Sequence, residues 1–126
     1  MKQQVIACSM PNGIEQIQPD FHVAPQLDSA GIAAAKAAGF RSIINNRPDG
    51  EGGAEQPTSA ELEARALSAG LVYHHLPVSP SNHSEDDARR MSALVEASPK
   101  PVLAFCRTGK RAAALYRKGE AEDRAR

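Results

Sequence analysis

The sequence predicts an α/β fold in which a mostly parallel sheet is flanked by helices. Short apolar segments, typical of buried strands, alternate along the chain with segments whose apolar residues recur at helical spacing. Glycine, proline and helix-capping residues separate the two kinds of segment. The chain has 126 residues, which suffices for one hydrophobic core but not for two. We therefore expect one folded domain.

The first part of the chain contains two predicted strands with a helix between them. The strands cover residues 21–24 and 41–46. Between them, Asp28 is a suitable N-cap for a helix that runs to about residue 38, where Gly39 provides a left-handed stop. The following stretch, RPDGEGGAEQP at 47–57, contains three glycines and two prolines and predicts a loop.

The middle of the chain predicts a second helix and a third strand. Thr58 and Glu61 have the spacing of a capping box, and Gly70 marks the end of the helix that this box opens. Residues 71–78 form the next predicted strand, and the turn residues of 79–82 stop it.

The last part of the chain predicts two more helices around a final strand at 102–105. Ser84 and Asp87 form a second capping box, and the apolar face of the helix that follows consists of Met91, Leu94 and Val95. The last helix should end near Gly119, and the charged tail beyond it should fray. We divide the chain into an N-terminal segment (1–17), a folded domain (18–118) and the tail (119–126).

The composition argues against several classes of function. Fifteen basic and fifteen acidic residues cancel without forming blocks, so neither nucleic acid nor a membrane surface is an expected partner. The longest apolar stretches have about five residues, far fewer than the ~20 that a membrane span needs. The apolar core at 5–8 is too short for a secretory signal, so we expect a cytoplasmic protein.

The sequence also predicts neither a disulfide nor a metal site. Cys8 lies in a polar segment and Cys106 beside an apolar one, which makes a structural disulfide the weaker interpretation. His74 and His75 are adjacent on a predicted strand and face opposite sides, so they cannot chelate one ion together. We expect no metal ion and no cofactor.

The run CRTGKR at 106–111 predicts the reactive centre. It places the Cys106 thiol between a strand and a helix start, with three cations and one glycine close by. Such a turn directs successive N–H groups into one concavity, which favours an anion and a thiolate nucleophile. The alternative is that Cys106 is a small buried residue ending a core strand. A structural cysteine needs no flanking cations, so we favour the catalytic interpretation.

Residues around this cysteine and after other strands are candidates for substrate binding. The fork of Arg111 suits an oxyanion, and Arg107 and Lys110 either contact substrate or form a solvated rim. Because the carboxyl ends of parallel strands meet at one edge, the polar residues after residue 45 and the segment after residue 78 should converge there too. The candidate substrate-binding set is Arg107, Thr108, Gly109, Lys110, Asn46, Arg47 and Asp49, although plain turn chemistry explains Asp49 equally well.

The chain resembles the phosphatase-like domain of beta-lactamase hydrolase-like proteins from about residue 18 to residue 117. The resemblance rests on six segments: Val23-Ala24-Pro25-Gln26, Ala38-Gly39-Phe40, Ile44-Asn45-Asn46-Arg47-Pro48-Asp49-Gly50-Glu51, Ala69-Gly70-Leu71, Leu76-Pro77-Val78 and Phe105-Cys106-Arg107-Thr108-Gly109. It implies a fold similar to that of dual-specificity cysteine phosphatases, a catalytic domain at 18–118, and Cys106 in the position of the catalytic cysteine.

The loop departs from the usual phosphatase pattern in ways that leave the reaction open. Four residues separate Cys106 from Arg111, one fewer than in most cysteine phosphatases, and Ala112 replaces the usual Ser or Thr. The shorter pattern resembles the loop of rhodanese-type sulfur transferases, in which the thiolate carries a persulfide. The position after Val78, where phosphatases commonly carry an acidic residue, is Ser79. The candidates to replace that acid are His83, Asp86 and Asp87, although the two aspartates also suit the first turn of a helix and His83 an exposed loop.

The sequence thus predicts a cysteine enzyme that acts on a small anionic substrate. The resemblance favours a hydrolase of phosphorylated substrates that forms a covalent Cys106 intermediate. The loop favours a sulfur transferase that uses thiosulfate or a persulfide, and fused relatives suggest by analogy a persulfide-oxidising enzyme as its partner. A third alternative is an anion-binding module without catalysis.

Overall fold

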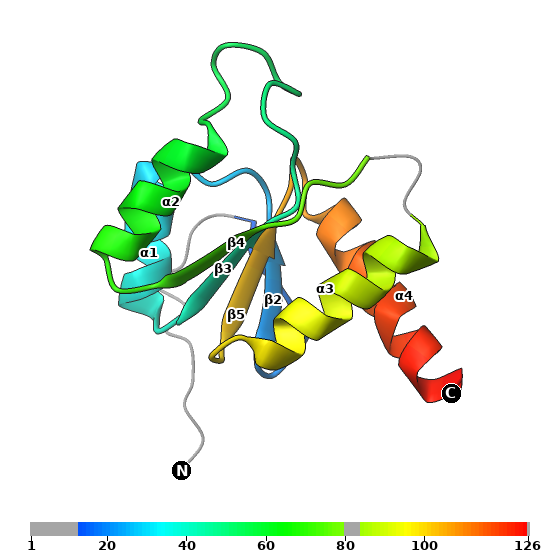
Figure 1. Cartoon of the computed structure of the whole chain (residues 1–126). Coiled ribbons are helices and arrows are strands. Elements are labelled where there is room, and N and C mark those ends of the chain that lie inside the picture. The colour runs from blue at the N-terminus through cyan, green and yellow to red at the C-terminus, as the bar shows by residue number, and fades with distance from the viewer. Residues whose placement is uncertain (1–12, 80–83, 126) are drawn as a thin grey trace.

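Five strands form one sheet in the order β1-β2-β5-β3-β4 (Figure 1). They are β1 (Glu15–Gln18), β2 (Phe21–Ala24), β3 (Ser42–Asn45), β4 (Val72–His75) and β5 (Val102–Phe105). β1 is antiparallel to β2, and the other neighbouring pairs are parallel. The computed structural model describes residues 13–79 and 84–125 of the chain. The predicted mostly parallel sheet is confirmed.

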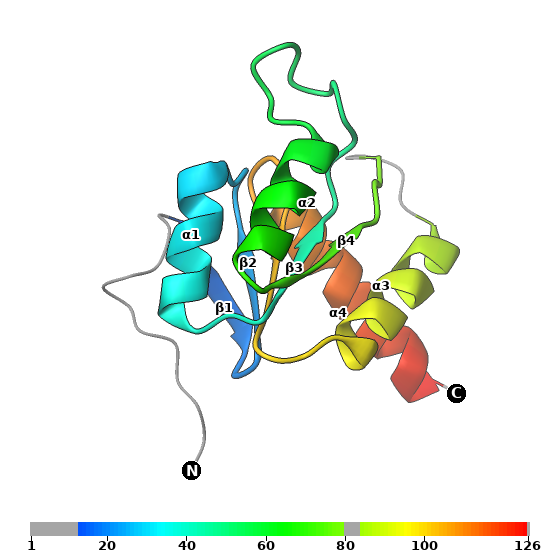
Figure 2. The same cartoon turned by 60° about the vertical axis from the view of Figure 1, so that its left-hand side comes forward.

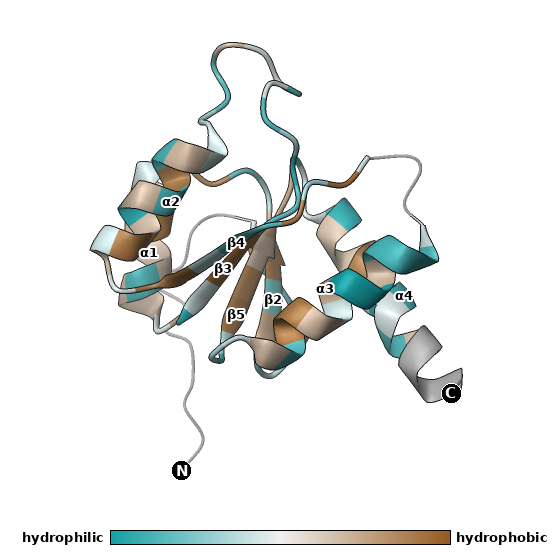
Figure 3. Cartoon of the chain, viewed as in Figure 1, coloured by the Kyte–Doolittle hydropathy of each residue, from teal (hydrophilic) through white to brown (hydrophobic). Residues whose placement is uncertain are grey.

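Two helices cover each face of the sheet (Figures 1 and 2). α1 (Ser29–Ala38) and α2 (Ser59–Ser68) lie on one face, and α3 (Glu85–Ala97) and α4 (Lys110–Ala125) lie on the other. Neighbouring residues of a strand enter different cores: Ile43 packs with the α1 and α2 side chains, whereas Ile44 packs with those of α3 and α4. Figure 3 shows hydrophobic residues concentrated along the strands that both helix layers cover. The three-layer α/β architecture follows from this alternation.

Local capping signals fix the helix starts as predicted. The Asp28 carboxylate accepts the Gly31 N–H at 2.8 Å. Both predicted capping boxes are present, Thr58 with Glu61 before α2 and Ser84 with Asp87 before α3. These contacts satisfy N–H groups that the first helical turn leaves free, which is why the sequence alone located them.

Two elements at the ends of the chain differ from the prediction. β1 lies largely in the segment assigned to the N-terminus, and its sequence EQIQ contains only one apolar residue. The last helix does not end near Gly119 and the tail is not frayed there, because α4 continues to Ala125. Gly119 lies against α3, where an added Cβ would be 2.7 Å from the Ala88 carbonyl oxygen. The glycine therefore permits a close helix crossing and is not a stop signal.

Within the described ranges, no helix combines the length and the apolar character needed to cross a bilayer.

Replacing Gly119 by alanine should destabilise the protein, although alanine is the better helix former. The new methyl group would overlap the α3 backbone, so we expect the free energy of unfolding to fall by about 1–3 kcal/mol, the usual cost of overpacking. Urea denaturation measures this change. As a control, Ala114→Gly on the exposed side of α4 should cost only the propensity difference of about 1 kcal/mol. A stabilised Gly119→Ala protein would contradict the proposed packing.

The buried imidazole of His22 should make stability depend on pH. Its ring packs edge-on against Phe40 with centroids 5.1 Å apart, and its Nδ1 has no hydrogen-bond partner within residues 13–79 and 84–125. Burial lowers the pKa of His22, and the nearby Asp20 carboxylate only partly opposes this effect. The unfolded chain therefore binds a proton more readily, so the contribution of neutral His22 is complete above pH ~6.5 and declines as the pH falls below that value.

The comparison of wild type with His22→Leu tests this prediction. The free energy of unfolding, measured by denaturant titration between pH ~5 and ~8, should fall more steeply toward acid pH in wild type than in the variant. Equal slopes for the two proteins would show that His22 does not contribute.

Candidate functional site

Three loops meet at the carboxyl edge of the parallel strands (Figure 1). They follow β3, β4 and β5, and backbone hydrogen bonds join them. Asn46 N donates to Phe105 O at 2.9 Å, and Val78 N donates to Asn46 O at 3.1 Å. The loop after β5 also joins β2, since Cys106 N donates to Ala24 O at 3.4 Å. The structure thus brings together the three loops that the sequence predicted to converge.

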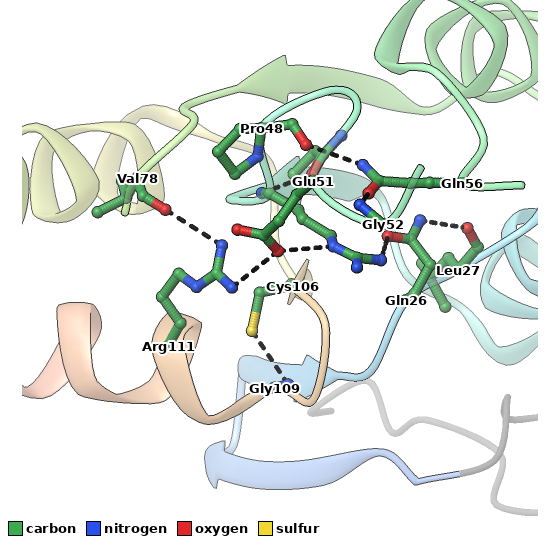
Figure 4. Close-up of polar contacts among 12 residues, drawn as sticks. Gln26, Leu27, Pro48, Glu51, Gly52, Gln56, Val78, Cys106, Gly109 and Arg111 are labelled. Atoms are coloured by element: carbon green, nitrogen blue, oxygen red, sulfur yellow. Dashed lines mark hydrogen bonds and ion pairs between the residues drawn. The ribbon is translucent and has the colours of Figure 1, made fainter. Parts of the chain in front are cut away.

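Cys106 is buried at the start of the loop after β5. Its Sγ accepts the N–H of Gly109 at 3.0 Å (Figure 4). Gly109 has φ +93°, and a Cβ at that position would lie 3.3 Å from the Ala24 carbonyl carbon and oxygen. Glycine is therefore needed for the loop to turn tightly over β2 and direct an N–H at the sulfur. α4 begins at the next residue, so its positive end lies beside this turn.

Arg111 lies in the first turn of α4 with its guanidinium buried. Nη1 donates to Val78 O at 3.1 Å, and Nη2 donates to Glu51 Oε1 at 3.0 Å. Nε is buried and has no hydrogen-bond partner among the described residues. An arginine with one unused and inaccessible N–H is unusual, because a buried donor normally finds an acceptor.

The Glu51 carboxylate links two arginines. Its Oε1 accepts from Nη2 of Arg111 and also from Nε of Arg47 at 2.8 Å, and Arg47 Nη1 donates to Gln26 Oε1 at 3.0 Å (Figure 4). Partial burial raises the pKa of Glu51, but the hydrogen bonds and charges of Arg111 and Arg47 together outweigh it and hold this pKa below its usual value. Glu51 is therefore a carboxylate at neutral pH.

The loop that carries Glu51 is attached to its surroundings by side chains of its own. Gln56 donates to Pro48 O at 2.9 Å and accepts the Gly52 N–H at 2.6 Å. Asp49 accepts the N–H of Ser59, the first residue of α2, at 2.7 Å. The Asp49 carboxylate thus anchors the loop to α2.

An open cleft of about 580 Å³ lies above this group of charges. Its lining consists of Arg47, Glu51, Gly52, Arg107 and Arg111. Among the described residues of this lining, three guanidinium groups face one carboxylate, so this part of the cleft carries a net positive charge and suits an anion. Figure 4 shows Cys106 beside Arg111 and Glu51.

The remaining candidate binding residues divide between the rim and the interior. Arg107 is exposed and lines the cleft, whereas Lys110 and Thr108 are exposed on the turn, where Lys110 N donates to Thr108 Oγ1 at 3.3 Å. Asn46 is buried, and its Nδ2 donates to Leu76 O at 3.1 Å. Neither Asn46 nor Asp49 belongs to the cleft lining.

The candidate general acids do not line the cleft where the structure describes them. Asp87 accepts the Ser84 N–H at 3.1 Å in the capping box, and Asp86 forms an ion pair with Arg90 at 3.2 Å. Both aspartates therefore make contacts in the first turn of α3, which is the structural role that the sequence offered as the alternative to a general acid. His83 lies outside the described residues, as does Cys8.

Glu51 is a residue of the candidate site that the sequence did not single out. It occurs in a loop rich in glycine and proline, where a carboxylate is ordinarily exposed. The available signal was the spacing of four residues from Arg47, which permits a local ion pair. Its second partner, Arg111, is 60 residues away and required the fold. Within residues 13–79 and 84–125, no group of three metal-ligating side chains occurs.

The comparisons agree with this fold. Residues 13–123 match the family model of the phosphatase-like domain of beta-lactamase hydrolase-like proteins. A beta-lactamase hydrolase-like protein of Agrobacterium fabrum is 40% identical over 108 residues, which are 86% of this chain but only 25% of that relative. The chain thus spans a quarter of the length of this relative.

Solved structures extend the similarity to cysteine-phosphatase-like folds. A proposed phosphatase from Neisseria meningitidis is similar, with a TM-score of 0.78 and 32% identity, and the match covers 84% of this chain and 75% of that one. The catalytic core of the PP-IP phosphatase Siw14 from S. cerevisiae has a TM-score of 0.63 at 16% identity, covering 80% and 59%, which shows the fold alone. The chain belongs to the phosphatase-like domain family of beta-lactamase hydrolase-like proteins.

Proposed function

We propose that this chain is a cysteine-dependent hydrolase of small phosphorylated substrates. One observation carries the proposal: the Cys106 sulfur accepts an N–H of its own loop at 3.0 Å, beside the buried Arg111, whose Nε has no acceptor among the described residues. An N–H directed at sulfur stabilises a thiolate more than a thiol, and the adjacent guanidinium attracts a phosphoryl group. Membership of a phosphatase-like family supports the same reaction class.

The reaction proceeds in two displacements at phosphorus. The Cys106 thiolate forms a bond to phosphorus while the ester P–O bond breaks, and the leaving alcohol takes that electron pair. Water then attacks the phosphocysteine, the S–P bond breaks, and inorganic phosphate leaves with the thiolate restored. Arg111 and the N–H groups of residues 107–111 stabilise the charge on the phosphoryl oxygens in both steps.

The acid–base character of the cleft limits the substrates. Glu51 is the only carboxylate in the cleft lining among the described residues, and the two arginines that hold its pKa low make it a poor proton donor. Alcohols that are stable as anions should therefore leave most readily. We expect aryl phosphates to react faster than alkyl phosphates.

Sulfur transfer is the second candidate, and the short loop favours it. Four residues separate Cys106 from Arg111, and Ala112 provides no hydroxyl to assist departure of the thiolate. In this reaction the thiolate attacks the outer sulfur of thiosulfate, the S–S bond breaks, and sulfite leaves with the electron pair. No proton donor is required, which agrees with an ionised Glu51.

The mass of the Cys106 adduct should distinguish these candidates. Rapid quenching with an aryl phosphate such as para-nitrophenyl phosphate should yield protein carrying one phosphoryl group on Cys106, because the thiolate is the attacking group. Mass spectrometry of the peptide containing residue 106 provides the measurement. Addition of one sulfur atom from thiosulfate, with no phosphoryl adduct, would favour the transferase.

The control for this experiment is Cys106→Ser, which should form neither adduct and lose turnover. Full turnover in that variant would exclude Cys106 as the nucleophile. Tight binding of phosphate without any adduct in wild type would instead indicate an anion-binding module.

Replacing Arg111 by lysine should impair the chemical step while keeping the positive charge. The planar guanidinium of Arg111 donates to Val78 and Glu51 and leaves Nε for a substrate oxygen. Lysine cannot make all of these contacts. We expect kcat/KM to fall about 10²–10³-fold, as when an oxyanion donor is removed. Arg107→Lys on the exposed rim is the matched control and should change kcat/KM much less. Similar losses in both variants would argue against a special role for Arg111.

A further inference from the structure

The three charged groups that the Glu51 ion pairs join differ in how deeply they are buried. The side chains of Arg47 and Arg111 are 9% and 6% exposed, whereas that of Glu51 is 21% exposed. The carboxylate therefore lies nearer solvent than the guanidinium groups it joins. Of the three side chains, Glu51 is the one that can leave without moving the others.

Each arginine also has a second, neutral anchor. The Gln26 side-chain oxygen holds Arg47 at 3.0 Å, and the Val78 carbonyl oxygen holds Arg111 at 3.1 Å. These contacts remain if Glu51 turns away, so both guanidinium groups keep their positions. Two buried cations would then lack a counter-ion, and this unfavourable state would strongly favour the binding of another anion.

We propose that the Glu51 carboxylate occupies an anion-binding position, and that an incoming dianionic oxyanion displaces it and binds to both Arg47 and Arg111. Arg47 thereby becomes a substrate-contacting residue alongside the Cys106 loop. This inference deepens the proposed function, because it rests on the loop being the anion site and assigns the second half of that site.

The geometry of the shared oxygen supports this exchange. Arg47 Nε and Arg111 Nη2 both contact the same Glu51 oxygen, at 2.8 and 3.0 Å, so a single oxygen of a tetrahedral anion can occupy that position. Once Glu51 has turned away, another oxygen of the same anion can accept from Arg111 Nε, which is buried now and has no partner among the described residues. A carboxylate has only two oxygens, whereas sulfate or a phosphoryl group has enough to satisfy the arginines and the N–H groups of the loop together.

The backbone around Glu51 can accommodate the movement. The glycines on either side of the loop tip, Gly50 and Gly53, have open space where a Cβ would be. The base of the loop is held separately, by Asp49 on the Ser59 N–H. Rotation of the Glu51 side chain toward solvent therefore does not require the loop to detach from α2.

Sulfate binding to a Cys106→Ser protein tests the proposal without any turnover. Titration calorimetry is carried out at constant ionic strength maintained with chloride. Adding Glu51→Gln should tighten sulfate binding by roughly tenfold, because sulfate no longer displaces a charged competitor. Unchanged or weaker binding would identify Glu51 as a fixed support for the arginines and overturn the proposal.

Two further variants separate this effect from net charge. Glu55→Gln removes a carboxylate from the same loop outside this cleft, so it should leave the sulfate affinity nearly unchanged. In the Glu51→Gln background, Arg47→Gln should weaken sulfate binding several-fold, because one of the two guanidinium contacts is lost. An equal gain from Glu55→Gln, or no loss from Arg47→Gln, would contradict the proposal.

If the Glu51→Gln protein does not fold, a crystal structure of the protein with Glu51 unchanged and sulfate bound tests the proposal instead. In the protein with Glu51 unchanged, sulfate should lie within hydrogen-bond distance of both guanidinium groups, with the Glu51 side chain turned to solvent. Sulfate bound while Glu51 still joins the arginines would overturn the proposal. The outcome is independent of the phosphocysteine experiment, so the proposed reaction and this exchange can fail separately.

Discussion

The ion pairs that Glu51 forms with two buried arginines hold the candidate site together. Arg47 follows β3 and Arg111 lies in the first turn of α4, so one carboxylate joins the loop after β3 to the start of α4. Isolated buried guanidinium groups would be costly, and the shared carboxylate offsets that cost. The same contacts keep Glu51 ionised, so the structural role of the carboxylate and its poor capacity to donate a proton have one physical cause.

The end of β3 provides the rigid support that this arrangement requires. Asn45 accepts the Arg47 N–H at 2.8 Å and donates to the Tyr73 hydroxyl at 3.0 Å, which in turn contacts Ser59 at 2.9 Å. Burial raises the pKa of Tyr73 despite these hydrogen bonds, so its hydroxyl remains protonated and the network stays neutral. β3, β4 and the start of α2 are therefore connected beneath Arg47. Arginine placement depends on a buried polar network as much as on ion pairing.

The sequence predicted features whose signals are local. Capping boxes, the glycine after α1 and the alternation of apolar strands with helices each depend on residues close together in the chain. The convergence of loops followed from the geometry of parallel sheets. Glu51 and the continuation of α4 were missed because their explanations are contacts between distant segments. From the sequence alone, Gly119 indicates the end of a helix and Glu51 an exposed loop residue. Only the fold shows that Gly119 packs against Ala88 and that Glu51 contacts Arg111.

The constraint on leaving groups is common to both candidate reactions. An aryl oxide and sulfite are each stable as anions, so neither needs the strong acid that an ionised Glu51 cannot supply. The positive cleft attracts phosphate esters and thiosulfate alike, since both are oxyanions. The feature that discriminates between them is the loop itself. Its four-residue spacing and Ala112 affect how many oxygens it can surround and how readily the thiolate departs, so the reaction depends on the dimensions of the loop more than on its charge.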